Sequence, residues 1–270
     1  MSAESIKRIM NNNGMPYIGF CSLELLGSRL LDVKAKNRIP GDAKTVITTI
    51  FPYLLEDELY DKLNISRYAA MPDYHAVAGQ MLKNAAISLQ KLFPYEKFEP
   101  FIDNSPIPEV LAGVLAGLGV RGKNGLLITP DHGSYVFIGE IVTTWKIEAE
   151  EEYPANIPAC LECGECAKKC PSGALTPGGL DKNLCLSNIT QQKRELTPDE
   201  TSLIKSSGCA WGCDICQTCC PMNQNAKTTY ITEFINGARP HVLPGDDLSG
   251  RAYAWRGREV IGRNLRIIEG

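Results

Sequence analysis

The pattern of hydrophobic residues predicts both strands and helices in the first half of the chain. Ala43 to Phe51 and Ser134 to Thr144 are rich in β-branched and aromatic residues, which is typical of buried strands. Pro72 to Leu92 has the pattern of a long helix, in which Pro72 suits the first position and Asp73 the first turn. Together these segments predict a mixed α/β (α+β) fold.

The composition shifts near residue 150, where an acidic run leads into a cysteine-rich segment. Four glutamates lie between residues 148 and 152, and such a run is most simply a solvated connector. We therefore predict an α/β domain over residues 1–147 and a cysteine-rich domain over residues 148–225. Residues 226–270 are predicted to form a C-terminal tail that packs on the core.

Length, composition and charge exclude several classes of protein. With 270 residues and 44% hydrophobic content, the chain can bury a substantial core. Its formal net charge of −3 gives no overall attraction to nucleic acid or to an anionic membrane. The N-terminus lacks the apolar region of a signal peptide, and no apolar run approaches the roughly 20 residues that a membrane span requires. We expect a cytoplasmic protein without membrane contact.

A run of four cysteines carries the strongest chemical signal in the sequence. Cys160, Cys163, Cys166 and Cys170 stand at gaps of two, two and three residues, and Pro171 follows the last. This is the bacterial ferredoxin spacing, in which three close thiolates bind one iron–sulfur cube and the cysteine before proline binds another. The run predicts a low-potential electron-transfer module in a reducing compartment.

A second run repeats the same ending. Cys213, Cys216 and Cys220 stand at gaps of two and three residues, and Pro221 follows. Structural zinc sites also use cysteines two residues apart, so a pair of zinc sites is the alternative. Three cysteines at successive two-residue gaps before a Cys-Pro pair favour two [4Fe–4S] clusters.

The ligand count leaves one position open. Two cubes need eight thiolates, and the chain has eleven cysteines. The crosswise pattern assigns Cys220 to the first cube and Cys170 to the second, which then needs one further ligand. Cys185 or Cys209 could supply it, and spacing alone does not decide between them. Cys219 should point elsewhere, and Cys21 is expected to be a small buried hydrophobe.

One glycine motif matches a dinucleotide-binding site in sequence but not in its predicted structural context. Gly117, Gly119 and Gly122 match the dinucleotide-binding fingerprint, which works only after a strand and before a helix. Here a helix-like stretch from Glu109 to Leu118 precedes the glycines, and a strand-like stretch from Gly125 to Thr129 follows. We expect these glycines to permit close backbone approach to a partner surface or a flat ligand.

Several short motifs follow one another along the chain. They are Arg67-Tyr68, Asp73-Tyr74-His75, Gly117-Leu118-Gly119, Gly122-Lys123-Asn124, Gly133-Ser134, Phe137-x-Gly139-Glu140, Cys185-Leu186-Ser187 and Gly212-Cys213-Asp214-x-Cys216-Gln217. In this order they resemble the epoxyqueuosine reductase family of cobalamin-dependent iron–sulfur enzymes, which are related to reductive dehalogenases. The resemblance covers roughly residues 40–225.

This resemblance implies a nitroreductase-like domain that binds cobalamin with its lower base detached, followed by a ferredoxin-like double-cluster module. It implies that the clusters reduce cobalt to Co(I), a nucleophile toward electrophilic substrates, and it assigns the open ligand position to Cys185. The eight cluster ligands are then Cys160, Cys163, Cys166, Cys220, Cys170, Cys185, Cys213 and Cys216. The cobalamin-binding residues implied are Gly117, Gly119, Gly122, Lys123, Asn124, Gly133, Ser134, Phe137, Gly139 and Ser187.

The same resemblance makes Asp73 the candidate catalytic proton donor. A general acid needs a raised pKa, which burial beside an apolar corrin face would provide. The alternative is an ordinary carboxylate at a helix start, stabilised by the helix dipole. Tyr74 and His75 could assist Asp73 or simply pack.

The departures from the family concern the substrate. Members that act on tRNA usually carry a helical-repeat region after the clusters, whereas this chain ends about 50 residues after Cys220. Ala70-Met71-Pro72 and Asn104-Ser105-Pro106 also depart from the usual pattern. We therefore predict a reductase acting on a small electrophile, supplied by a ferredoxin or flavodoxin as low-potential electron donor. The alternatives are an electron carrier or corrinoid reductase serving another enzyme, and a true tRNA epoxyqueuosine reductase.

The C-terminal tail collects arginines. Five of them lie between residues 251 and 266, against two glutamates in the same region. They could touch RNA, an acidic redox partner or the cofactor's side groups. We expect instead that they dock on the protein's own surface, because a polyanion binder would normally be basic overall.

Overall fold

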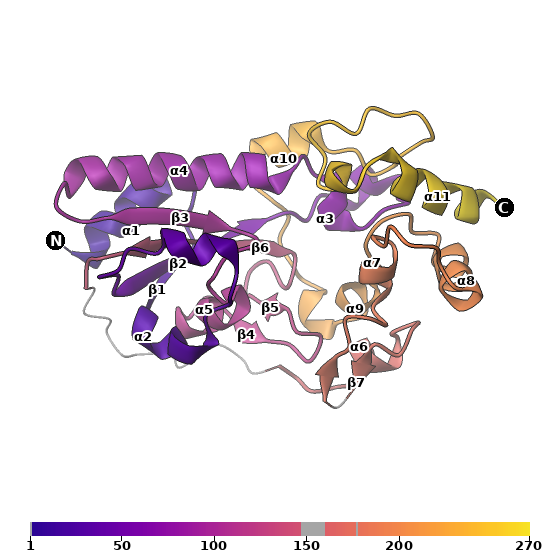
Figure 1. The fold of residues 1–270 in the computed structure, drawn as a ribbon, viewed down its shortest axis with the longest axis horizontal. Helices are drawn as coiled ribbons and strands as arrows, with labels where there is room; N and C mark the ends of the chain where they lie inside the picture. The colour runs from indigo at the N-terminus through magenta and orange to yellow at the C-terminus, as the bar shows by residue number, and fades with distance from the viewer. Residues whose placement is uncertain (1, 147–159, 177) are drawn as a thin grey trace.

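An antiparallel sheet organises the N-terminal half of the chain (Figure 1). The computed structural model describes residues 2–146, 160–176 and 178–270, so the acidic connector lies outside the described residues. Among these, the main sheet has the strand order β1 (Ile18–Ser22), β2 (Thr45–Pro52), β6 (Val136–Thr143) and β3 (Phe98–Ile102). Every residue of β2 is buried. The two strands predicted from β-branched patterns are thus the two central strands.

Helices cover both faces of this sheet. α4 (Tyr74–Leu92) packs along β3 and β6 on one face, and α1 (Ala3–Asn12) packs against α4. α5 (Glu109–Leu115) covers the other face, against β1, β2 and β6. Successive side chains of β2 point to opposite faces of the sheet. Ile47 packs in the hydrophobic cluster that includes α4, and Val46 packs in the cluster that includes α5.

The long helix begins two residues later than predicted. Asp73 is its N-cap, because the Asp73 carboxylate accepts a hydrogen bond from the backbone N–H of His75 at 3.0 Å. Pro72 lies before the helix and forms a β-bridge with Arg251 of the tail. The placement of Pro72 at the first helical position was wrong, since a cap with non-helical backbone at residue 73 fixes the start at Tyr74.

The cysteine-rich segment consists of loops with short elements and lies beside one end of the sheet (Figure 1). Because each element is short, it has little core of its own and depends on its neighbours for burial. Its elements are α6 (Glu165–Lys168), β7 (Leu175–Thr176), β8 (Gly179–Leu180), α7 (Leu186–Ile189), α8 (Pro198–Ser207), α9 (Ile215–Thr218) and η4 (Pro221–Asn223).

The C-terminal tail packs on the other parts of the chain. It contains α10 (Thr232–Gly237), η5 (Ala254–Arg256) and α11 (Arg258–Glu269). α11 contributes Val260 and Leu265 to the same hydrophobic cluster as α4. The remaining connections hold α2 (Leu23–Leu26), η1 (Gly27–Arg29), η2 (Lys34–Arg38), η3 (Asp57–Tyr60), α3 (Arg67–Ala70), β4 (Val120–Arg121) and β5 (Leu127–Ile128).

The described helices are all too short or too polar to cross a lipid bilayer.

Candidate functional site

Four cysteines from the two ferredoxin-like runs line one cavity of about 350 Å³. They are Cys160, Cys163, Cys166 and Cys220, and we call them the outer cysteine set. The first three come from the loop that leads into α6, and Cys220 comes from the Cys-Pro turn after α9. This is the crosswise grouping that the spacing predicted for the first cube.

The outer cysteine set lines one cavity, as the four ligands of a single metal centre must. Structural zinc sites also bring four ligands to one point. The choice between a zinc ion and an iron–sulfur cube therefore rests on the cysteine spacing.

The other four predicted ligands form the inner cysteine set, which we define as Cys170, Cys185, Cys213 and Cys216. Burial raises the pKa of the Cys213 thiol to about 11, and the neighbouring Cys185 and Cys170 add to this rise. Burial raises the pKa of Cys216 to about 12, with Cys213 and Cys185 as the next causes. Cys213 thus lies near Cys185 and Cys170, and Cys216 lies near Cys213 and Cys185. At Cys170, hydrogen bonds from Ser172 and the neighbouring backbone outweigh burial and lower the pKa of the thiol.

The extra cysteines have other surroundings. Cys209 is turned into the backbone, where its thiol donates to the carbonyl of Trp211 at 3.2 Å. Cys21 is 2% exposed on β1, as expected for a buried hydrophobe. Cys219 does not line the cavity of the outer cysteine set. These contacts favour Cys185 over Cys209 as the eighth ligand.

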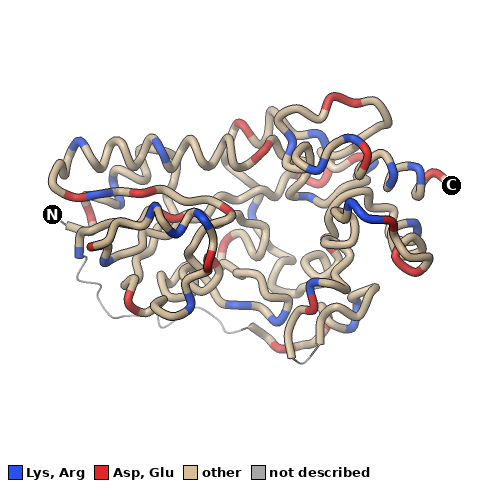
Figure 2. Tube along the Cα trace, in the orientation of Figure 1, with Lys and Arg blue, Asp and Glu red and all other residues tan. Residues whose placement is uncertain are grey.

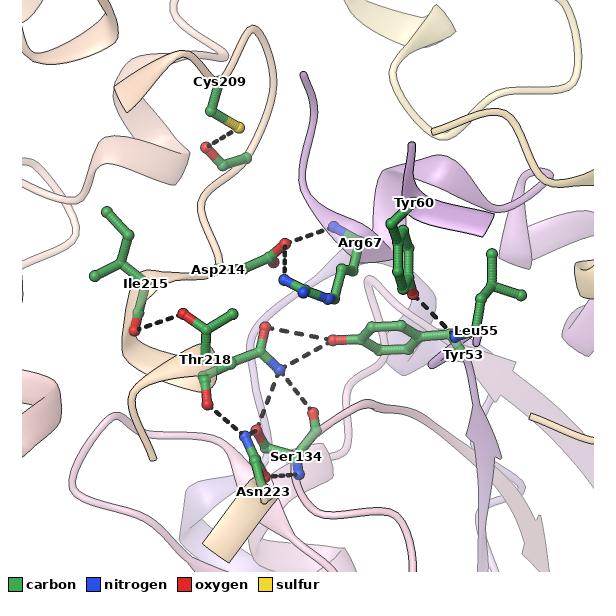
Figure 3. A network of polar contacts seen from close by, with 12 residues as sticks. Tyr53, Leu55, Tyr60, Arg67, Ser134, Cys209, Asp214, Ile215, Thr218 and Asn223 are labelled. Atoms are coloured by element: carbon green, nitrogen blue, oxygen red, sulfur yellow. Dashed lines mark hydrogen bonds and ion pairs between the residues drawn. The ribbon is translucent and has the colours of Figure 1, made fainter. Parts of the chain in front are cut away.

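A buried polar network joins the inner cysteine set to the sheet (Figure 3). Gln217, next to Cys216, donates to the Ser134 carbonyl at 2.9 Å and to the Tyr53 hydroxyl at 3.0 Å. Asn223 donates to the Ser134 hydroxyl at 2.9 Å and accepts from the Ser134 backbone N–H at 2.8 Å. Because every partner is buried, this network fixes the position of the inner set against β6.

A charged contact reinforces the same junction. Asp214 lies between Cys213 and Cys216 and accepts a hydrogen bond of 2.6 Å from the backbone N–H of Arg67 (Figure 3). Burial raises the pKa of Asp214 to about 6, and the Arg67 backbone and guanidinium oppose this rise.

A second cavity, of about 530 Å³, lies between α4, α5 and β6. Most of its wall is apolar, and Ser134 connects it to the network that holds the inner cysteine set. Such a wall fits the face of a flat macrocycle, and the described lining contains no histidine that could bind a metal. Its lining residues are Tyr74, Asp103, Glu109, Val110, Leu126, Leu127, Ser134, Val136, Phe137 and Ile138.

Proton-bearing side chains gather at one end of this second cavity. Asp103 accepts from the Tyr74 hydroxyl at 2.9 Å, and its Oδ2 lies 3.0 Å from Nε2 of His75. The two aspartates beside His75 raise its pKa to about 9, with Asp103 the larger cause. The hydrogen bond from His75 lowers the pKa of Asp103 to about 2. At neutral pH His75 is therefore cationic and Asp103 is ionised.

Asp73 itself does not line the cavity. Its carboxylate caps α4 and lies 2.6 Å from Nδ1 of His75. Asp73 therefore has the role at the helix start that was the alternative to catalysis. Its contact with Nδ1 also orients the His75 imidazole. Asp73 thus touches the site only through His75.

The predicted cofactor residues are divided between the two cavities. Ser134 and Phe137 line the second cavity, and Phe137 stacks on Tyr74 with ring centroids 4.1 Å apart. Gly122, Lys123 and Asn124 line the cavity of the outer cysteine set instead. The remaining five predicted residues, which line neither cavity, are Gly117, Gly119, Gly133, Gly139 and Ser187.

Some of these glycines serve packing. A Cβ on Gly133 would lie 2.2 Å from Asn223 Oδ1, so Gly133 permits the close approach of the cysteine-rich segment. A Cβ on Gly139 would lie 2.7 Å from Leu82, so Gly139 lets α4 approach β6. Gly117 and Gly119 lie between α5 and β4, and Gly122 follows β4, which is the reverse of the order that a dinucleotide site requires.

The sequence reading missed Asp103. It follows β3 with φ of 44°, and Asn104 follows with φ of 39°. Asp and Asn tolerate this left-handed conformation better than most residues, and the Asp-Asn-Ser-Pro sequence is a turn signal that could have drawn attention to the loop. Its neighbours Tyr74 and His75 come from a different element, so only the fold brings them together.

The arginines of the tail mostly bond to the protein itself. Arg251 donates to the Gly237 carbonyl at 2.9 Å, and Arg263 donates to the carbonyls of Gln192 and Arg194 at 2.8 and 2.9 Å. Figure 2 shows basic and acidic positions interspersed along the trace, including the C-terminal segment. These contacts agree with the expectation that the tail docks on its own protein.

Two family profiles match the chain. The profile described as "Epoxyqueuosine reductase QueG, DUF1730" matches residues 35–104. The profile described as "4Fe-4S double cluster binding domain" matches residues 159–223 and confirms the prediction of two [4Fe–4S] clusters.

Curated proteins of the same name are similar over much of the chain. The epoxyqueuosine reductase of Lactococcus garvieae (strain Lg2) is 32% identical over 243 residues, which are 83% of this chain and 68% of that protein. The epoxyqueuosine reductase of Gloeobacter violaceus is 40% identical over 164 residues, which are 60% of this chain and 50% of that protein. The chain thus matches 50% to 68% of the length of these two relatives.

Solved structures confirm the mixed α/β fold. The epoxyqueuosine reductase of Streptococcus thermophilus superposes with a TM-score of 0.82 and 24% identity, over 99% of this chain and 81% of that one. An epoxyqueuosine reductase with an epoxyqueuosine-modified tRNA-Tyr stem loop gives 0.80 and 24%, over 98% and 80%. A reductive dehalogenase described in terms of B12-dependent dehalogenation gives 0.51 and 15%, over 97% and 37%.

Proposed function

The chain belongs to the epoxyqueuosine reductase family, and we propose that it reduces the epoxide of epoxyqueuosine in tRNA. As a member of this family it is an oxidoreductase. The names of its relatives, and the relative bound to a modified tRNA stem loop, favour this substrate over the small electrophile predicted from the sequence. A true tRNA epoxyqueuosine reductase was the last of the alternatives drawn from the sequence, and it is now the preferred hypothesis.

One observation carries the proposal. The cavity that holds Tyr74, Asp103 and Glu109 lies next to the network that fixes the inner cysteine set. A protein that only carried electrons would need the clusters but not a cavity edged with proton-bearing groups. Reduction of an epoxide by two electrons takes up two protons, so both features are required together.

Cobalamin would place one face of its macrocycle against the apolar wall of the second cavity. Phe137, Val136 and Leu126 would pack against the macrocycle, and Ser134 would lie at the edge nearest the inner cysteine set. When bound, cobalamin would supply the redox-active metal centre between the clusters and the epoxide. The B12-dependent dehalogenase that shares the fold supports this assignment.

The protein's own residues would handle the protons. His75 is positively charged at neutral pH and is held between Asp73 and Asp103. It does not line the cavity itself, so it would supply a proton to the epoxide oxygen by way of the Asp103 carboxylate, which does. Tyr74 is fixed by Asp103 and by stacking on Phe137, and can orient the substrate. Asp73, predicted as the proton donor, keeps a place in this proposal as the residue that positions His75.

The proposal also includes the partners expected from the sequence. A ferredoxin or flavodoxin would reduce the outer cluster, which lies on the exposed side of the cysteine-rich segment. The tRNA would present one modified nucleotide to the second cavity. Its affinity would come from few phosphate contacts, since the tail arginines bond internally.

The test is a direct comparison of substrates. Anaerobically reconstituted protein with cobalamin and a strong reductant should convert an epoxyqueuosine-containing tRNA stem loop over multiple turnovers, as seen by mass spectrometry of the nucleosides. The same protein should leave simple small epoxides unreacted. Conversion of small epoxides but not of the stem loop would reject the proposal and restore the small-electrophile reading.

A further inference from the structure

A carboxylate lies in the middle of the sheet, where no charge is expected. Glu140 is on the central strand β6 and is 0% exposed. It points toward α5, because its neighbours Ile138 and Val142 on the same face pack in the α5-side clusters. Its cross-strand partner on β2 is Thr48, which is also 0% exposed. Burial of an ionised carboxylate in such a place is costly unless it is paired or keeps its proton.

The polar atoms around Glu140 are poorly satisfied. Among the described residues, both carboxylate oxygens of Glu140, Oγ1 of Thr48 and Oε1 of Glu109 are buried without a hydrogen-bond partner of ordinary geometry. The Ser105 hydroxyl is the polar neighbour of Glu140, and Ser105 is 3% exposed. Native proteins rarely leave such a group of buried atoms without a functional reason.

The two carboxyl groups influence each other. Burial raises the pKa of Glu140 well above its usual value, and the charge of Glu109 adds to this rise. Burial raises the pKa of Glu109 to about 7, and Asp103 adds to the rise while His75 opposes it. The other titratable groups that sense this pair are Tyr74 beside Glu109 and Cys21 beside Glu140. Two carboxyl groups so placed keep at least one proton at neutral pH.

Glu109 connects this pair to the second cavity. Its carboxylate lines the cavity and accepts a hydrogen bond from the backbone N–H of Asp103. Asp103 in turn holds both Tyr74 and His75. A proton leaving Glu140 would therefore reach the cavity through Glu109, at the end where the proton-bearing side chains gather.

We infer that Glu109 and Glu140 form a buried carboxyl pair that stores a proton and delivers it to the second cavity. The inference rests on the proposed function. Two electrons arrive through the clusters, one proton comes from His75 and the second from Glu109. Glu140 then returns a proton to Glu109. Because Glu140 is 0% exposed, its proton is restored through Glu109 at the cavity, whereas the exposed His75 takes its proton from solvent directly. In this balance two electrons and two protons break both C–O bonds of the epoxide, which leaves a carbon–carbon double bond and releases the oxygen as water.

The first test is spectroscopic and needs neither cofactor nor substrate. Difference infrared spectra of the purified protein should show the C=O band of a protonated carboxyl group at pH 6, where exposed carboxyls are ionised. Part of this band should disappear as the pH rises through about 7. Glu109→Gln should abolish the loss of band intensity near pH 7, whereas the contribution of Asp214, whose pKa burial raises to about 6, should remain. Glu140→Gln should remove the part of the band that persists at higher pH. Glu99→Gln, an exposed glutamate on β3, is the matched control and should change neither.

The second test is kinetic. In the reconstituted enzyme the rate should fall as pH rises through about 7, because the protonated pair is the competent form. Glu109→Gln should lower the rate on the order of 10²-fold and remove this ionisation from the pH profile. If Glu140→Gln does not fold, Glu109→Gln decides the matter alone.

Two results would overturn the inference. One is the absence of any protonated carboxyl band in the wild-type spectrum at pH 6. The other is a Glu109→Gln enzyme with an unchanged rate and pH profile. If the protein failed to reduce the tRNA but kept the titrating band, the proposed function would fall and the carboxyl pair would stand.

Discussion

The outer and inner cysteine sets have the same ligands but different surroundings. In the outer set, Cys163 is exposed, and Leu161 beside it is 60% exposed. In the inner set, Cys213 and Cys216 are buried enough to raise their thiol pKa values to about 11 and 12. The outer set thus contains the one exposed cysteine of the two sets, and the other seven cysteines are partly buried.

The contacts around the two sets also differ: those beside the outer set are exposed, and those beside the inner set are more buried. Lys123 and Glu162, with 3.7 Å between their charged atoms, form an exposed ion pair beside the outer set. Gln217 joins the inner set to buried Ser134, just before β6, and Asp214 joins it to the backbone of Arg67 in α3. A cluster that must accept electrons from a partner needs exposure, whereas one that must deliver them to a buried cofactor needs a fixed position. From this difference we expect electrons to flow from the outer set to the inner set and then to the second cavity.

The largest expected effect comes from removing an inner ligand. Cys185→Ala should lower the iron content of anaerobically prepared protein from about eight to about four atoms per chain and abolish turnover. Cys209→Ala is the matched control, because Cys209 bonds to the backbone carbonyl of Trp211. It should keep both clusters. Loss of iron in Cys209→Ala but not in Cys185→Ala would reassign the eighth ligand.

The next effect concerns the acids at the second cavity. Asp103→Asn should slow turnover by about 10²–10⁴-fold, because Asp103 holds both His75 and Tyr74. Asp73→Asn should cost less, about tenfold, since Asp73 acts only through His75. Both variants should keep eight iron atoms.

The same pair of acids sets a pH dependence. In the wild-type enzyme the rate should also fall above pH 9, where His75 loses the proton that Asp103 and Asp73 stabilise. Asp103→Asn should move this fall to lower pH, because the main cause of the raised pKa is gone. A larger loss of rate in Asp73→Asn than in Asp103→Asn would restore Asp73 as the proton donor.

The structure could be predicted from the sequence at some sites and not at others. The cysteine spacing predicted the grouping of the outer set, because ligand geometry is local and depends on gaps of two or three residues. The central strands were also predictable, since β2 and β6 have the β-branched residues of buried strands. The end of the long helix at Leu92 was right, and its start was misplaced only because Asp73 caps it.

The second cavity could not be predicted in this way. Asp103, Glu109 and Tyr74 come from three elements with no common periodicity, and their meeting depends on how α4 and α5 pack on the sheet. The glycine motifs were ambiguous for a related reason. Gly133 and Gly139 are required for the approach of Asn223 and Leu82, which are distant in sequence.

A smaller effect is expected at the junction of the inner set. Gln217→Ala removes hydrogen bonds to Ser134 and Tyr53 and leaves their buried groups unsatisfied. This should lower the free energy of unfolding by about 1–3 kcal/mol, measured by anaerobic urea denaturation. Because Gln217 also separates the inner cluster from the second cavity, the variant should slow electron transfer from the clusters to bound cobalamin. Wild-type stability and transfer would show that the junction does not depend on this network.

The smallest effect is expected beside the outer set. Lys123→Met removes the ion pair with Glu162, and both side chains are more than half exposed. Exposed pairs contribute about 0–1 kcal/mol and are screened by salt, so the free energy of unfolding should change by less than about 1 kcal/mol. Both clusters should remain, because the pair binds no ligand cysteine directly. If Lys123→Met lost the outer cluster, this segment would depend on a fixed contact as the inner set does. The contrast between an accessible outer site and an anchored inner one would then have to be abandoned.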